Sequence, residues 1–209
     1  MAGISITAAK STPDVRYPRW IVRAVRSPVA VPRANVAQTV AVIVEILEPI
    51  IERERRTIEL DIPPDLLVRV DELRLRQILL NLLGNALKYT PAATSITICA
   101  TCGSVADLRQ RVPSMSAPDH HLSLSPSDQF ALISIRDRGP GISAEDQARL
   151  FTKFMRLDSA LNSKQQGSGL GLYLCRQLTE AMGGSIWVES AGISGAGSTF
   201  FLTVPTYQS

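Results

Sequence analysis

Residues 71–89, DELRLRQILLNLLGNALKY, constrain the fold of this chain more than any other stretch. Their apolar side chains recur at the spacing of one helical face, at Leu75, Ile78, Leu79, Leu82, Leu83 and Ala86. Asp71 is suited to cap the start of this helix, and Thr90-Pro91 is suited to end it. The pattern therefore predicts an amphipathic helix with its apolar face in a core.

The same helix carries a second, polar stripe. Asn81, Asn85 and Lys88 lie at i, i+4 and i+7, so their side chains share one side of the helix. From the helix alone, a solvated polar edge and a ligand-binding edge are equally well supported.

Length, composition and charge narrow the class of protein. The chain has 209 residues, of which 45% are apolar, which suits one substantial globular domain with appendages. Residues 1–34 hold six basic side chains and one acid, and we expect them to form a poorly ordered basic leader. Nucleic acid is not expected as a partner, because no binding motif accompanies this charge. We find no membrane segment and no signal peptide, so we expect a cytoplasmic chain.

The cysteines and histidines do not suggest a metal site. Cys99 and Cys102 are three apart in an apparent strand, so they point to opposite faces, and no second pair completes a zinc site. We interpret them, with Cys175, as small buried residues. His120 and His121 lie among Ser, Pro and Asp residues, which favours a solvated loop over a ligand or phosphoacceptor role.

The order of elements predicts an α+β fold. Helices are expected at about 35–56, at 71–89 and at 172–182, with Pro49 kinking or ending the first. Strands are expected at 57–62, 66–70, 95–101, 130–137, 183–190 and 198–205. The first two strands should form a hairpin, and residues 103–129 should form a surface insertion without regular structure. The expected architecture is a two-layer sandwich, with one mixed sheet of about five strands covered on one face by about three helices.

Two further motifs suggest a nucleotide site. Gly167-Ser-Gly169-Leu-Gly171 opens a helix, where backbone N–H groups can approach a phosphate closely. It neither follows a strand nor ends in Gly-Lys-Ser/Thr, so a dinucleotide fold and the common phosphate loop are disfavoured, while a flexible hinge stays open. Asp137 ends a buried strand before Gly-Pro-Gly, where it would suit an adenine amine or a simple Asx turn.

Five motifs in order resemble the ATP-binding catalytic domain of two-component sensor histidine kinases, a family grouped with gyrase, Hsp90-type chaperones and MutL. They are NLLGNALKYTP, DRGPGI, LFTKFMR, GSGLGLYLC and MGGSIWVES…GSTFFLTVP, similar to the Asn box, first glycine box, Phe box, second glycine box and closing strands. The resemblance spans about residues 36–205. It implies a domain over 35–206 with a Bergerat-type sandwich and a mobile ATP lid.

The resemblance implies a role for each matching residue. Asn85 would hold Mg²⁺ with Asn81 beside it, Lys88 would reach the phosphates, and Tyr89 would line the pocket. Asp137 would accept a hydrogen bond from the adenine amine. The remaining implied nucleotide contacts are Gly139, Gly141, Ile142, Phe154, Lys164, Gly167, Ser168, Gly169, Leu170, Gly171, Leu172 and Ser198.

The lid and the catalytic set follow from the same resemblance. Phe151 and Phe154 would anchor and hinge the lid, and Arg156 or Lys164 would meet the γ-phosphate. The catalytic residues would be Asn85, Lys88 and Arg156.

The resemblance also implies the reaction, which is transfer of the γ-phosphate of ATP–Mg²⁺ to a histidine. No stretch before residue 36 resembles the dimerisation domain that bears this histidine, so we expect it on a separate polypeptide or a missing segment, with a response regulator as an indirect partner. Asn81 stands where ATP-hydrolysing relatives carry a glutamate base, which argues against fast hydrolysis. A non-catalytic nucleotide-binding module, a gyrase- or Hsp90-like ATPase and a serine kinase of the anti-sigma type remain alternatives.

Overall fold

A five-stranded mixed sheet forms the centre of the molecule. The computed structural model describes residues 33–112, 127–155 and 169–207. The strand order is β2 (Thr57–Asp61), β4 (Ser95–Ser104), β5 (Gln129–Arg136), β7 (Thr199–Pro205) and β6 (Ser185–Glu189). β2 runs parallel to β4, and the other neighbouring pairs are antiparallel.

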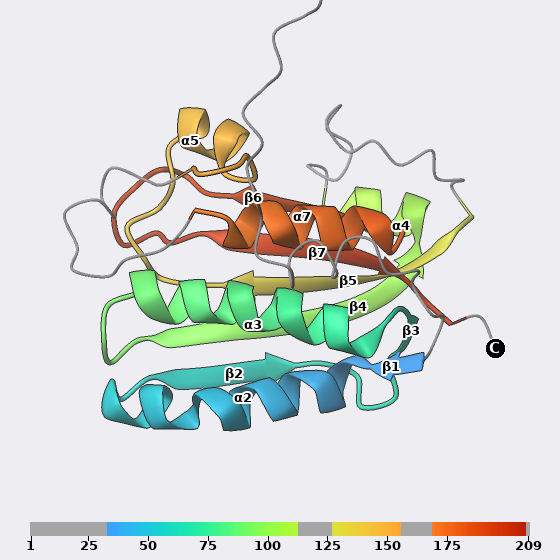
Figure 1. Cartoon of the computed structure of the whole chain (residues 1–209), viewed down its shortest axis with the longest axis horizontal. Helices are drawn as coiled ribbons and strands as arrows, with labels where there is room; N and C mark the ends of the chain where they lie inside the picture. The colour runs from blue at the N-terminus through green and yellow to red at the C-terminus, as the bar shows by residue number, and fades with distance from the viewer. Residues whose placement is uncertain (1–32, 113–126, 156–168, 208–209) are drawn as a thin grey trace, which may run out of the picture.

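Three helices cover one face of this sheet, α2 (Val36–Arg53), α3 (Glu72–Tyr89) and α7 (Gly171–Ala181), as Figure 1 shows. The apolar stripe of α3, including Leu75, Ile78 and Leu82, is buried in one cluster with Ile98 of β4 and Ile133 of β5. Burial of these side chains stabilises the sandwich through the hydrophobic effect. The predicted α+β two-layer fold is therefore confirmed.

The ends of α3 are fixed as the sequence predicts. Oδ1 of Asp71 accepts hydrogen bonds from the backbone amides of Leu73, at 2.9 Å, and Arg74, at 3.3 Å. At the other end, Thr90 leaves the helix in an extended conformation before Pro91, as the proline requires. The position and length of the helix that carries the polar stripe are thus determined locally.

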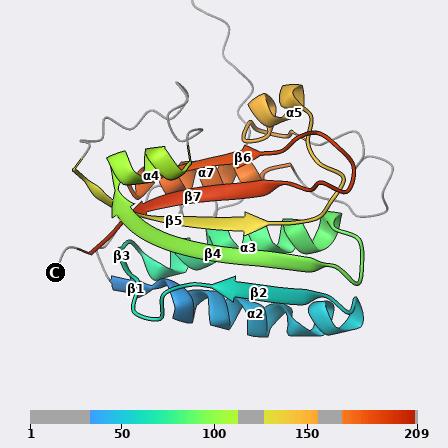
Figure 2. The same cartoon turned by 180° about the vertical axis from the view of Figure 1, so that it is seen from behind.

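The opposite face of the sheet carries a helix that was not expected. Ser104 and Asp107 form a capping box at the start of α4 (Val105–Arg111), inside the stretch predicted to lack regular structure. Figure 2 shows α4 on the face of the sheet that α3 and α7 do not cover. Val105 and Leu108 are buried there in a second cluster, which also contains Phe130, Leu132, Trp187 and Phe201. The prediction of a patternless insertion was therefore wrong for its first part, while residues 113–126 lie outside the described residues.

The predicted hairpin between residues 57–62 and 66–70 is also wrong. β2 pairs with β4, whereas β3 (Leu67–Arg69) pairs with β1 (Arg33–Asn35) in a small separate sheet. Pro63 and Pro64 lie between the two strands. They favour an extended backbone and have no N–H group to donate a hydrogen bond between the strands of a hairpin. Val68 of β3 is completely buried in this small sheet.

Two smaller expectations need correction. α2 continues through Pro49 to Arg53, because Pro49 and Glu45 lie on the exposed side, where water can satisfy the carbonyl that lacks its helical donor. Cys102 is exposed and Cys99 is half-buried, so only Cys175 is buried as predicted. The described residues contain no cluster of three metal-ligating side chains.

The remaining described elements agree with the sequence. The hydroxyl of Ser143 caps the short helix α5 (Ala144–Arg149) by accepting a hydrogen bond from the amide of Asp146. None of the helices in the described ranges has the length and apolar character needed to cross a membrane. The poorly ordered leader was expected to reach residue 34, but Arg33 and Ala34 belong to β1 and Ala34 is buried, so this limit was wrong. Residues 1–32 lie outside the described part of the chain.

Candidate nucleotide-binding site

A pocket opens where α3 and α7 meet the loop that follows β5. Its walls contain seven residues predicted for the nucleotide site, and α3, α7, the β5 loop and β7 all contribute to it. The lining residues are Asn85, Ala86, Tyr89, Asp137, Pro140, Gly141, Ile142, Leu150, Leu172, Ser198 and Phe200. The fold therefore brings together segments that are far apart in the sequence.

Asp137 is the one acidic residue among these lining side chains. It is only 6% exposed, and its Oδ1 accepts hydrogen bonds from the amides of Gly139, at 2.7 Å, and Ser198, at 3.2 Å. Burial raises the pKa of Asp137, and the two backbone hydrogen bonds oppose this effect. Its Oδ2 accepts no hydrogen bond from the described residues, so it is available to a donor in the pocket.

The loop after Asp137 needs glycine at two positions. A Cβ atom on Gly139 would lie 2.9 Å from Oδ1 of Asp137 and 3.1 Å from the carbonyl oxygen of Tyr89. Gly141 has a φ of +78°, and a Cβ atom there would lie 2.9 Å from the carbonyl oxygen of Ile193. The loop can thus pack between the end of α3 and the β6–β7 turn only because side chains are absent.

Sequence reasoning missed the residues that fix this loop. The hydroxyl of Ser190 accepts a hydrogen bond from the amide of Ile142 at 3.0 Å and donates one to the carbonyl of Gly197 at 2.7 Å. The side-chain amide of Gln147 donates to the carbonyls of Ile142, at 2.7 Å, and Ser190, at 2.9 Å. These partners are too far apart in the sequence to form a recognisable motif.

The polar stripe of α3 faces the start of α7. Nδ2 of Asn85 donates a 3.2 Å hydrogen bond to Oδ1 of Asn81. A Cβ atom on Gly171 would overlap the amide of Asn81, so the two helices meet here without a gap. Among the described residues no side chain caps α7, so its first backbone amides stay available to an anion.

Lys88 ends the polar stripe of α3, and Tyr89 is the last residue of this helix. Nζ of Lys88 lies 5.0 Å from the centre of the Tyr89 ring, and this ring is one wall of the pocket. Lys88 does not line the pocket itself. Lys88 lies on α3 one turn beyond Asn85, and the family resemblance implies that it would reach the phosphates of the nucleotide.

The Phe box divides into a buried and an exposed residue. Phe151 is buried and packs edge-to-face on Phe200, with 6.5 Å between the ring centres. Phe154 is 54% exposed and has a φ of +62°, so it is neither an apolar anchor nor a lining residue of the pocket. A Cβ atom on Gly169 would lie 2.9 Å from Cα of Phe154, so the backbone at Gly169 packs directly against the backbone at Phe154.

Several predicted residues are not tested by the structure. Arg156, Lys164, Gly167 and Ser168 lie outside the described residues, as do the predicted lid and both histidines. Leu170 is described and precedes α7 as its N-cap residue.

Comparisons with known proteins agree with this geometry. The family model described as histidine kinase-, DNA gyrase B-, and HSP90-like ATPase matches residues 70–208. The adaptive-response sensory kinase SasA of Synechococcus sp. (strain JA-2-3B'a(2-13)) is 38% identical over 167 residues, which cover 79% of this chain and 37% of that protein. SasA of Synechococcus elongatus (strain ATCC 33912 / PCC 7942 / FACHB-805) is 36% identical over 168 residues, covering 78% and 36%. The chain thus spans little more than a third of the length of these relatives.

Solved structures show the same fold. The crystal structure of full-length ShkA in complex with AMPPNP superposes with a TM-score of 0.63 at 27% identity, covering 90% of this chain and 34% of that one. The mycobacterial sensor histidine kinase MprB gives a TM-score of 0.62 at 21% identity, covering 86% and 100%.

Proposed function

The chain belongs to the family of histidine kinase-, DNA gyrase B- and HSP90-like ATPases, and from that premise we propose that it binds ATP with Mg²⁺ and transfers the γ-phosphate to a histidine on a dimerisation domain. The observation that carries the proposal is that Asp137 and Asn85 line one pocket from separate segments of the chain. The carboxylate of Asp137 is suited to bind adenine, and the amide of Asn85 is suited to bind a metal ion on the phosphates.

Asp137 would select the base. Its Oδ1 is held by two amides, and its Oδ2 would accept a hydrogen bond from the exocyclic amine of adenine. Ile142, Leu172 and Phe200 supply apolar walls for a flat ring. Such a site would reject guanine, which presents a carbonyl oxygen where adenine has its amine.

Asn85 would hold Mg²⁺ through its side-chain oxygen. Mg²⁺ prefers oxygen ligands and retains several waters, so one amide oxygen together with phosphates fits this ion. Because Nδ2 of Asn85 is bonded to Asn81, its Oδ1 remains available, and Asn81 would orient Asn85 rather than bind the metal directly. When bound, Mg²⁺ neutralises charge on the transferring phosphoryl group.

The phosphates would lie between Lys88 and the start of α7. The ammonium of Lys88 and the uncapped amides of α7 both favour negative charge there. Gly169 and Gly171 would allow the backbone to approach, and Arg156, Lys164, Gly167 and Ser168 remain predicted contacts of the same phosphates.

Transfer to a partner is favoured over hydrolysis by water. An ATPase needs a base to activate water, but Asn81 occupies the position of that base in ATP-hydrolysing relatives and cannot take a proton at neutral pH. The similarity to sensory kinases supports a kinase reaction. The histidine acceptor on a helical domain, the response regulator as an indirect partner and the cytoplasmic site of action are part of the proposal.

A phosphotransfer assay tests this function. The purified chain is incubated with Mg²⁺, ATP labelled at the γ-phosphate and dimerisation domains taken from the SasA relatives. We expect an acid-labile, alkali-stable label on the acceptor, which is lost when the acceptor histidine is replaced by glutamine. Tight ATP binding without any label across these acceptors would favour a regulatory module, and steady-state hydrolysis without acceptor would favour an ATPase.

A further inference from the structure

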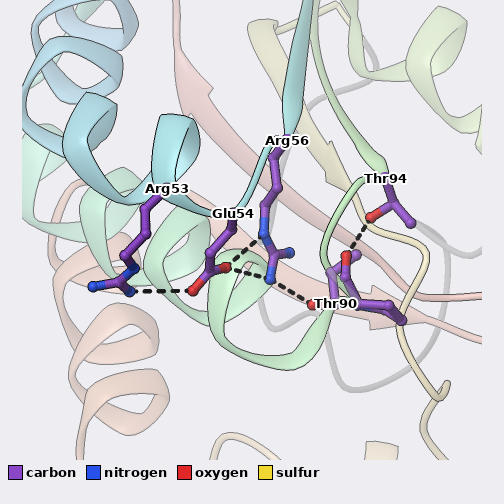
Figure 3. A network of polar contacts seen from close by, with 6 residues as sticks. Arg53, Glu54, Arg56, Thr90 and Thr94 are labelled. Atoms are coloured by element: carbon purple, nitrogen blue, oxygen red, sulfur yellow. Dashed lines mark hydrogen bonds and ion pairs between the residues drawn. The ribbon is translucent and has the colours of Figure 1, made fainter.

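An ion pair outside the pocket connects the end of α2 to the end of α3. Oε2 of Glu54 accepts a 2.8 Å hydrogen bond from Nε of Arg56, and Nη2 of Arg56 lies 2.6 Å from the same oxygen in an ion pair (Figure 3). The side chain of Arg56 is only 4% exposed. Burial raises the pKa of Glu54, but hydrogen bonds from Arg56 and Arg53 outweigh this and lower it overall, so Glu54 is charged at neutral pH.

The same guanidinium reaches the chain directly after the polar stripe. Nη2 of Arg56 donates a 2.6 Å hydrogen bond to the carbonyl oxygen of Thr90, which ends α3. Two backbone bonds run in parallel, from the amide of Ala93 to the carbonyl of Glu54 at 3.0 Å and from Thr57 to Thr94 at 3.2 Å. The corner between α2 and β2 therefore holds the loop that follows α3.

This loop is adjacent to the proposed adenine site. Thr90 directly follows Tyr89, whose ring lines the pocket. The carbonyl of Tyr89 lies against Gly139, at 3.1 Å from the position of a Cβ atom, and the amide of Gly139 bonds Oδ1 of Asp137. A shift of the Thr90 carbonyl would consequently move the contact between α3 and the Asp137 loop.

The pair is poorly explained by stability alone. Burying a guanidinium is costly, and the carboxylate of Glu54 is 26% exposed, so water weakens its attraction to Arg56. Within the described part of the chain, Nη1 of Arg56 and Oγ1 of Thr90 are buried without hydrogen-bond partners, so the arrangement leaves part of this cost uncompensated. What Arg56 does supply is a fixed position for one carbonyl.

We propose that Glu54 and Arg56 are positioning residues of the nucleotide site, which act by fixing the end of α3 against the loop of Asp137. The inference rests on the proposed ATP site and extends it to a corner of the fold that does not touch the ligand. Arg53 provides a matched control, because it bonds Oε1 of the same carboxylate at 3.2 Å but is 71% exposed and does not bond Thr90.

The experiment compares Arg56→Met, Arg56→Lys and Arg53→Met by calorimetric titration with AMP-PNP and Mg²⁺. Arg56→Met should weaken affinity roughly 3- to 30-fold. Arg56→Lys should recover part of this loss, because an ammonium can still donate to the Thr90 carbonyl, and Arg53→Met should bind like the wild type. In ¹⁵N spectra without nucleotide, the Gly139 amide resonance should move in Arg56→Met and stay in place in Arg53→Met.

Wild-type affinity and an unmoved Gly139 resonance in Arg56→Met would overturn the inference. If Arg56→Met does not fold, Glu54→Gln and Arg56→Lys take its place with the same two readouts. The Gly139 resonance tests the connection without any ligand, so failure of the wild type to bind AMP-PNP would count against the proposed function alone.

Discussion

The side-chain nitrogen of Asn85 donates a 3.2 Å hydrogen bond to the side-chain oxygen of Asn81, one turn earlier in α3. Because an amide carries its nitrogen and oxygen on one carbon, this bond fixes which way the oxygen of Asn85 points. Asn81 is in turn confined by the start of α7 at Gly171. The two asparagines therefore form a unit in which one orients the other, and their roles can be separated by mutation.

Asn85→Ala should remove the metal-dependent part of nucleotide binding while the fold persists. Its ADP affinity in the presence of Mg²⁺ is expected to equal the affinity measured with a chelator, because the proposed oxygen ligand is lost. Titration calorimetry with and without Mg²⁺ measures this, with Gln77→Ala on the same helix as control. A large remaining Mg²⁺ effect in Asn85→Ala would place the metal elsewhere.

Asp137→Asn should separate stability from binding. The pKa of Asp137 is raised by burial, so the folded state holds its proton more tightly than the unfolded state. The free energy of unfolding therefore falls as the pH rises from the pKa of Asp137 in the unfolded chain to its higher pKa in the folded protein. Above the folded pKa the full loss of stability is present. At neutral pH the asparagine, whose oxygen can keep both amide bonds, should unfold at a higher temperature.

The same variant should bind adenine nucleotides roughly 10- to 100-fold more weakly, since a hydrogen bond to a charged group contributes about 1.5–3 kcal/mol. Thermal denaturation and calorimetry measure the two effects, with Asp61→Asn on the exposed strand β2 as control. A lower unfolding temperature together with unchanged affinity would contradict this assignment of Asp137.

The three cysteines should differ sharply in reactivity. Burial raises the pKa of the Cys175 thiol to about 12 and also raises the pKa of Cys99, whereas Cys102 is exposed. Because the thiolate is the reactive form, iodoacetamide at pH 8 should modify Cys102 first and Cys175 only after unfolding. Peptide mass spectrometry over a time course measures the order. Early modification of Cys175 in the folded protein would show that α7 opens.

Local patterns predicted the elements that carry the site. The apolar period and the caps of α3 come from residues within one stretch, so the limits of this helix follow from that stretch alone. The glycines that follow Asp137 and those at the start of α7 stand out in the sequence as motifs. The need for glycine there comes from distant groups, such as Ile193 beside Gly141 and Asn81 beside Gly171.

Contacts between distant segments could not be predicted in this way. Whether residues 57–61 pair with β3 or with β4 depends on which partner lets Ile58 pack on the helices, and no local pattern encodes that choice. The supports of the pocket, Ser190, Gln147 and Arg56, are ordinary polar residues in the sequence. Their roles exist only once the fold places a carbonyl or an amide opposite each of them.

Gly171→Ala should weaken nucleotide binding, because the new methyl group overlaps the amide of Asn81 and displaces it from Asn85. Gly84→Ala is the matched control on α3, since a Cβ atom there meets nothing within 4 Å. Alanine at position 84 should raise the free energy of unfolding by about 0.5–1 kcal/mol. Denaturant unfolding and calorimetry measure both variants. Unchanged affinity in Gly171→Ala would mean that α7 can move away without consequence for the site.

Ser190→Ala should loosen the loop that carries Gly141 and Ile142. The substitution leaves the Ile142 amide and the Gly197 carbonyl without the hydroxyl that now bonds both, and one such unpaired group costs about 1–3 kcal/mol. Because Ile142 lines the pocket, affinity for ADP should fall together with the free energy of unfolding. Ser95→Ala, at the start of β4, is the control for loss of a serine hydroxyl. Stability lost without any change in ADP affinity would show that the β6–β7 turn supports the sheet but does not shape the nucleotide pocket.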